Sequence, residues 1–130
     1  MKKATLLLLI VLFQSNAFAK AELTGSQYLS ICGDGNQFNT CLISFFTMKA
    51  GFDYGFNSYP VFILNKKTFK NSEQLYCQDA AAKWKRKDIY NDFLGMLKNL
   101  DKTDKESLNQ DIALIMLQYL SARFPVDKCI

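Results

Sequence analysis

The sequence predicts a small all-α protein, a single-domain bundle of about four helices held by two disulfides. Apolar residues recur at helical spacing in most of the segments that follow the N-terminal region. Four cysteines, an even number, occur in a chain that begins like an exported protein. These two observations together favour one compact helical core braced by covalent links.

Residues 1–19 have the pattern of a cleavable bacterial signal peptide. Lys2 and Lys3 precede an apolar run over residues 4–13, and the small residues of the Ala-Phe-Ala triplet predict cleavage after Ala19. The run is too short for a comfortable membrane span. We therefore expect a periplasmic protein whose mature domain is residues 20–130, with no membrane attachment after cleavage.

The composition of the mature chain excludes several function classes. Its 111 residues suit one domain, and 14 basic against 12 acidic residues do not indicate a nucleic-acid partner. The chain has no histidine, which excludes Ser-His-Asp and Cys-His nucleophiles and histidine-based zinc sites. The spacing of Asp34 and Asp53 does not bring these carboxylates together as an acid–base pair. We therefore predict a protein that is not an enzyme and holds no metal or cofactor.

The first two helices are marked by their start and stop signals. Thr24 and Gln27 form a T-x-x-Q capping box, and Gly33 ends the helix that follows. Asn39 is a candidate N-cap for a second helix, which carries a stripe of phenylalanines, and Pro60 is predicted to end it. A short connection rich in glycine and asparagine would join the two helices.

Residues 58–76 form the least regular segment and include a small cluster of lysines, Lys66, Lys67 and Lys70. The favoured interpretation is a solvated loop. The alternative is a contact surface, because loops held by a rigid scaffold often carry binding residues.

Two further helices are predicted in the C-terminal half. Apolar residues over 86–100 share one face and predict the third helix. The basic run over 83–87 is expected either to lie outside that helix or to pair with acids, because cations at a helix start oppose the macrodipole. Thr103 and Glu106 are predicted to cap the last helix, which Pro125 ends.

Four cysteines allow three pairings, and the sequence alone does not choose among them. The predicted helices favour Cys32 with Cys41, across the first helical hairpin. They also favour Cys77 with Cys129, because the third and fourth helices would place their outer ends side by side.

Four stretches follow one another along the chain, "LTGSQYLSIC", "CLISFFTMKAGFDYG", "YCQDAAAKW" and "LSARFPVDKC". Their order resembles that of the Rap/Tai family of periplasmic immunity proteins of the type VI secretion system. The chain departs from the family pattern at Asp79, where a proline is expected there or one position away. It also departs after Pro125, where three residues come before Cys129.

The resemblance implies a protein that binds and inhibits a cognate peptidoglycan amidase effector similar to the papain-like cysteine peptidases. Either a monomer or a homodimer is compatible with it. Because interface hot spots favour Tyr, Trp and Arg, we name candidate partner-binding residues, although ordinary packing or solvated charge would equally explain each one. They are Tyr54, Tyr59, Lys66, Lys67, Trp84, Lys85 and Arg86.

The main rival interpretation is a periplasmic acid-stress chaperone of the HdeA type, which is also small, helical and disulfide-bonded. Proteins of that type have one disulfide, whereas this chain has four cysteines. Client protection near pH 2–3 would distinguish the two functions.

Overall fold

The computed structural model describes residues 23–62 and 74–129, and it describes side chains in these ranges except at 56–62. The predicted signal peptide, Lys66 and Lys67 lie outside the described residues. The protein is a small all-α domain, as predicted. Its elements are α2 (Gly25–Cys32), α3 (Phe38–Phe62), α4 (Gln78–Ala82), α5 (Arg86–Thr103), the 3-10 helix η3 (Lys105–Asn109), α6 (Ile112–Arg123) and the 3-10 helix η4 (Val126–Cys129).

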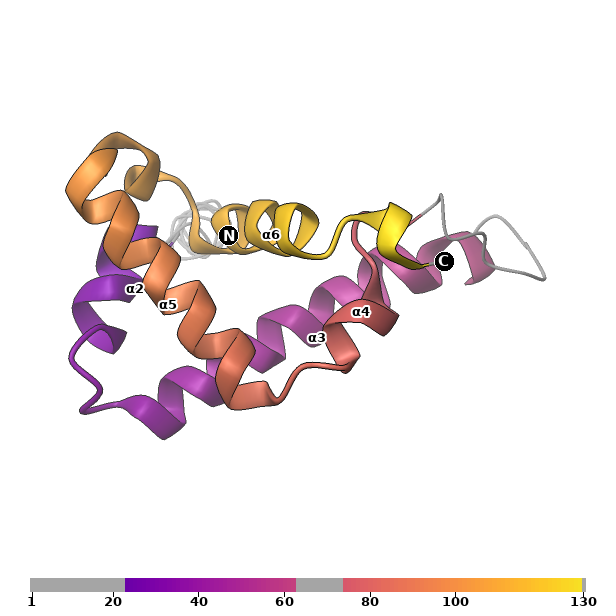
Figure 1. Ribbon diagram of the computed structural model, residues 1–130, viewed down its shortest axis with the longest axis horizontal. Helices are drawn as coiled ribbons and strands as arrows, with labels where there is room; N and C mark the ends of the chain where they lie inside the picture. The colour runs from indigo at the N-terminus through magenta and orange to yellow at the C-terminus, as the bar shows by residue number, and fades with distance from the viewer. Residues whose placement is uncertain (1–22, 63–73, 130) are drawn as a thin grey trace, which may run out of the picture.

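The helices meet around one aromatic centre. The long α3 runs beneath α5 and α6, while the short α2 packs beside α5 (Figure 1). Phe93 of α5 is fully buried, and its ring lies 6.1 Å from Tyr28 of α2, 5.1 Å from Phe45 of α3 and 5.2 Å from Tyr119 of α6, measured between centroids. Because all four main helices supply a ring to this cluster, it fixes their mutual arrangement.

The entrance to α2 is held by local and by distant bonds. The predicted capping box is confirmed, because the Thr24 hydroxyl accepts from Gln27 N at 3.2 Å and the Gln27 side chain accepts from Thr24 N at 2.9 Å. Gly25 N also donates to Gln110 O at 3.0 Å, and Ile112 N donates to Leu23 O at 2.8 Å. The segments that lead into α2 and α6 are therefore bonded to each other.

The second helix begins at Phe38, close to the predicted start, but Asn39 is not its N-cap and Pro60 does not end it. Phe38 N donates to Gly35 O at 3.2 Å, and Cys41 N donates to Gln37 O at 2.9 Å, so α3 grows directly out of the preceding turn and Asn39 lies inside it. At the other end α3 continues through Pro60 to Phe62. A proline removes one N–H donor and can kink a helix without ending it.

The third helix begins at Arg86, as predicted, so Arg86 and Lys87 lie in the first turn of α5 and not outside the helix. Both cations lie over aromatic rings of α3. The Arg86 guanidinium lies 5.3 Å from the Phe46 ring centroid, and Lys87 Nζ lies 5.7 Å from that of Phe38. These cation–π contacts offset the unfavourable position of the cations at a helix N-terminus.

The capping box predicted at Thr103 and Glu106 was also wrong. Thr103 is the last residue of α5, and its hydroxyl donates to Asn99 O at 2.9 Å. Asp104 caps η3, and α6 begins later, where Asp111 accepts from Ala113 N at 2.7 Å. No helix within the two described ranges is long and apolar enough to cross a bilayer.

Candidate interaction surface

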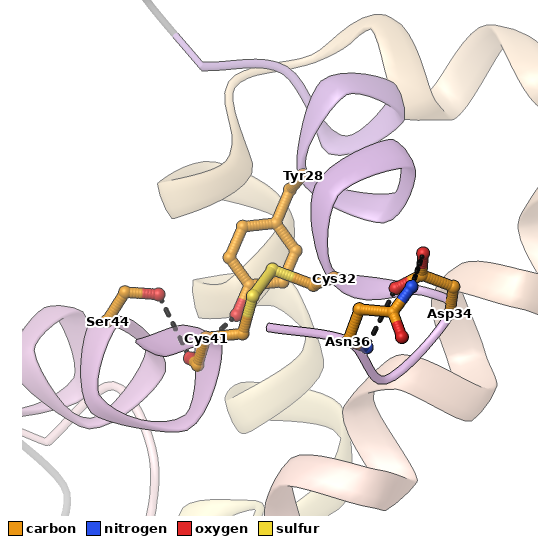
Figure 2. The surroundings of a disulfide bond; sticks show 6 residues. All are labelled: Tyr28, Cys32, Asp34, Asn36, Cys41 and Ser44. Carbon is orange, nitrogen blue, oxygen red and sulfur yellow. Dashed lines mark hydrogen bonds between the residues drawn. A yellow bond between two sulfur atoms is a disulfide. The ribbon is translucent and has the colours of Figure 1, made fainter. Parts of the chain in front are cut away.

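The predicted pairing of Cys32 with Cys41 is confirmed, and it closes the connection between α2 and α3. Figure 2 shows the Tyr28 side chain beside this bond, with its hydroxyl donating to Cys41 O at 3.1 Å. Burial raises the pKa of Tyr28 above its usual value. In the same connection the Asp34 carboxylate accepts from Asn36 N and Nδ2 at 2.9 and 2.8 Å, so these side chains shape a turn.

The predicted pairing of Cys77 with Cys129 is also confirmed. The bond joins the start of α4 to the C-terminal segment, and Cys77 N donates to Phe124 O at 2.7 Å in the same place. Cys77 Sγ additionally accepts from Ala80 N at 3.3 Å and so caps α4. Two disulfides are consistent with an oxidising compartment outside the cytoplasm.

The chain turns sharply between α4 and α5, and we call residues 83–87, at this turn, the α4–α5 corner. All five of these residues are exposed. Trp84 is nevertheless fixed, because its ring meets the Phe124 ring edge-on at 5.4 Å between centroids and the Arg123 guanidinium lies 4.9 Å from its centroid. The corner therefore presents an ordered aromatic side chain that remains 37% exposed.

The four cations of the corner, Lys83, Lys85, Arg86 and Lys87, carry positive charge that is not neutralised locally. Within the described part of the chain, none of them makes an ion pair with a carboxylate. Lys49 and Arg123, which lie nearby, do make such pairs. Among the described residues, the corner therefore gathers four cations without an ion-pair partner in a protein whose charge is nearly balanced.

A cavity of about 340 Å³ opens between α3 and the corner. Phe46, Trp84 and Arg86 line this cavity. Ala81 of α4 also lines it, and its small side chain leaves the space open. Its volume lies at the lower end of the range for small-ligand pockets, about 300–1,000 Å³. The cavity suits one or two inserted side chains better than a large cofactor.

The Lys49–Asp53 pair lines the same cavity and anchors the segment before α4. Lys49 Nζ lies 2.9 Å from Asp53 Oδ2, and the buried Tyr76 hydroxyl donates to Asp53 Oδ1. Burial raises the pKa of Tyr76 far above its usual value, and the hydrogen bond to Asp53 and the negative charge of that carboxylate raise it further. This network holds the cavity wall in place.

A matching network ties α5 to α6 on the other side of the corner. The Tyr119 hydroxyl donates to Asp92 Oδ2 at 2.8 Å, and Arg123 Nε lies 3.1 Å from the same oxygen. Burial and the bond to Asp92 raise the pKa of Tyr119 strongly. Because Arg123 also contacts the Trp84 ring, this network supports the aromatic part of the corner.

The structure brings together only some of the residues predicted to bind a partner. Trp84, Lys85 and Arg86 lie at the corner. Tyr54 is 75% exposed on α3, and between described residues no ring contact or hydrogen bond joins it to the corner. Tyr59 lies in α3, but its side chain is outside the described residues.

Sequence reasoning missed Phe46, Arg123 and Phe124 as parts of this surface. Phe46 belongs to an apolar helical stripe and so indicates only a core position. Arg123 and Phe124 lie about forty residues after Trp84 in the sequence. Only the second disulfide prediction, which brings the C-terminus to the start of α4, carried a signal for their proximity.

A larger cavity of about 840 Å³ lies between α5 and α6. Its charged lining residues, Asp92 and Arg123, pair with each other, so they give it no excess of either charge. Among the described residues, no cluster of three or more acidic, cysteine or histidine side chains could hold a metal ion. The α4–α5 corner is therefore the stronger candidate for an interaction surface.

Comparisons with protein-family models, with curated proteins and with solved structures found no match to this chain.

Proposed function

We propose that this protein is a periplasmic immunity protein that binds and inhibits a peptidoglycan amidase effector of the type VI secretion system. It would reach the periplasm through a signal peptide cleaved after Ala19. The order of the sequence motifs supports this function. The pairing of Cys32 with Cys41 and of Cys77 with Cys129 is also compatible with it, because inhibition by binding favours a rigid scaffold.

One observation carries the proposal, namely the fixed and half-exposed Trp84 at the corner of this cross-linked domain. Tryptophan is among the residues that contribute most to protein interfaces. Because Phe124 and Arg123 already hold the ring, binding would cost little further side-chain entropy. Such a surface blocks an enzyme by occupying it, so inhibition requires no reactive group from this chain.

Co-expression tests the proposed function directly. A papain-like amidase encoded in the adjacent reading frame would be directed to the periplasm with and without this protein. We expect the protein to prevent lysis, and the purified pair to form a complex without peptidoglycan hydrolysis. Lysis that continues with every neighbouring amidase would refute the proposal, and protection of client proteins at pH 2–3 would favour an acid-stress chaperone instead.

Two variants test whether Trp84 carries the interaction. Trp84→Ala is expected to weaken binding by about 2 kcal/mol or more, as interface hot spots do. Leu114→Ala is the matched control, because Leu114 is an apolar residue of α6 that is 47% exposed. Equal affinities of both variants and the unchanged protein would place the interface elsewhere.

A further inference from the structure

The chemistry of the α4–α5 corner indicates what kind of partner surface it selects. Arg86 is exposed, makes no ion pair with any described carboxylate, and is held in position by the Phe46 ring at 5.3 Å. An arginine fixed in this way keeps its planar set of N–H donors free for a second partner. Carboxylates match that geometry, because both of their oxygens can accept at once.

The cavity beside Arg86 also limits the shape of a partner side chain that could bind there. Its aromatic side chains, Phe46 and Trp84, would contact the aliphatic part of an inserted side chain. Lys49 and Asp53 also line it but neutralise each other, so Arg86 gives the cavity an excess of positive charge. The combination of an apolar wall and a free guanidinium fits a glutamate or aspartate side chain.

The neighbouring lysines favour a partner that presents more than one carboxylate. Lys83, Lys85 and Lys87 are exposed and make no ion pair with a described carboxylate. The exposed acids next to them in sequence are Asp79 and Asp88, so the corner keeps a positive excess. Charge complementarity then favours a partner segment with several carboxylates, which also speeds association.

We infer that the α4–α5 corner is a docking surface for an acidic segment of a partner protein, which inserts a Glu or Asp side chain against Arg86, Phe46 and Trp84. This inference deepens the proposed function, on which it rests for the identity of the partner. It adds the chemistry of the surface that the partner must present. A nucleic acid is disfavoured, because the cations form one compact corner beside a side-chain-sized cavity and do not line an extended groove.

The chain supplies its own probe for this binding, because Trp84 is its only tryptophan. We would titrate the protein with a ten-residue peptide of alternating Glu and Ser while following tryptophan fluorescence at low ionic strength. The control peptide has Gln in place of every Glu. We expect a saturable change with the Glu peptide, and binding of the Gln peptide at least ten-fold weaker.

Two variants of equal charge change separate the site from general electrostatic attraction. Arg86→Gln is expected to weaken binding of the Glu peptide at least ten-fold. Lys98→Gln, on the exposed side of the same helix, should change it less than two-fold. Thermal unfolding of both variants would verify that the fold is intact.

Several results would overturn the inference. They are equal binding of the two peptides, equal weakening by the two variants, and tighter binding of a fifteen-residue thymidine oligonucleotide than of the Glu peptide. The inference and the proposed function fail separately. An amidase inhibited equally by the unchanged protein and by Arg86→Gln would refute the docking surface alone. Specific Glu-peptide binding with no amidase neutralised would refute the immunity function alone.

Discussion

Removing the two disulfides separately should cost different amounts of stability, because they close loops of different length. Cys77 and Cys129 are separated by 52 residues, whereas Cys32 and Cys41 are separated by 9. The loop entropy of the unfolded chain then gives about 4 kcal/mol for the long loop and about 2.5 kcal/mol for the short one. For a domain of this size these losses lower Tm by about 15 °C and about 10 °C.

The experiment compares two double variants, Cys77→Ala with Cys129→Ala and Cys32→Ala with Cys41→Ala. Calorimetry gives Tm, and urea unfolding gives the free energy of unfolding. Cys32 and Cys41 are both buried, whereas Cys129 is only partly buried, so packing losses act against the predicted order. A larger loss of unfolding free energy on removing the Cys77–Cys129 bond would therefore strongly support the loop-entropy explanation.

One further variant isolates the role of Cys77 as a helix cap. Combining Cys77→Ser with Cys129→Ala breaks the bond but keeps an acceptor for Ala80 N, which now donates to the sulfur. We expect it to be slightly more stable than the double alanine variant. An equal or smaller loss for the long-loop pair than for the short-loop pair would refute the entropic reasoning.

Three further predictions concern two glycines and the buried tyrosines. Gly25→Ala should destabilise the fold by about 1–3 kcal/mol, because the added Cβ would lie 2.5 Å from Ile115 Cδ1 and 3.2 Å from Leu108 O. At Gly95 an added Cβ would have no atom within 4 Å, so Gly95→Ala should instead stabilise α5 by up to about 1 kcal/mol. If the urea midpoints of the two variants moved in the same direction, this reasoning would be contradicted. Stability should also fall above pH 10, because unfolded tyrosines ionise there while the raised pKa values of Tyr76 and Tyr119 keep both protonated in the folded protein. Each tyrosine lowers the free energy of unfolding by about 1.4 kcal/mol per pH unit in this range. Tyr119→Phe should therefore make the urea midpoint decline less steeply between pH 10 and 11.5. An unchanged slope would show that Tyr119 is not responsible for the loss of stability.

The sequence predicted the features that depend on local rules. The capping box at Thr24 and the pairing of Cys32 with Cys41 involve residues close in the sequence, so local signals suffice for them. The pairing of Cys77 with Cys129 was predicted from two antiparallel helices, whereas in the structure it is α4, at Cys77, that contacts η4, at Cys129. The all-α class followed from the helical spacing of apolar residues.

The incorrect predictions were those that tertiary contacts decide. Arg86 enters the first turn of α5 because a ring of α3 receives its charge, and no local rule contains that ring. Thr103 and Glu106 match a capping box, but the chain forms η3 at that point, so α6 begins later, beside the segment that leads into α2. The placement of Trp84 between Phe124 and Arg123 likewise depends on how the C-terminal segment packs.

The cysteines are joined in the order in which they occur along the chain, so the two rings they close are separate and not interlocked. A polypeptide that crosses a membrane from its N-terminus presents Cys32 and Cys41 to an oxidant before Cys77 emerges. The first ring can then close while neither Cys77 nor Cys129 is present to compete for its thiols. The second ring must wait for Cys129, which follows Cys77 by 52 residues, so in an exported chain translocation itself would order the oxidation.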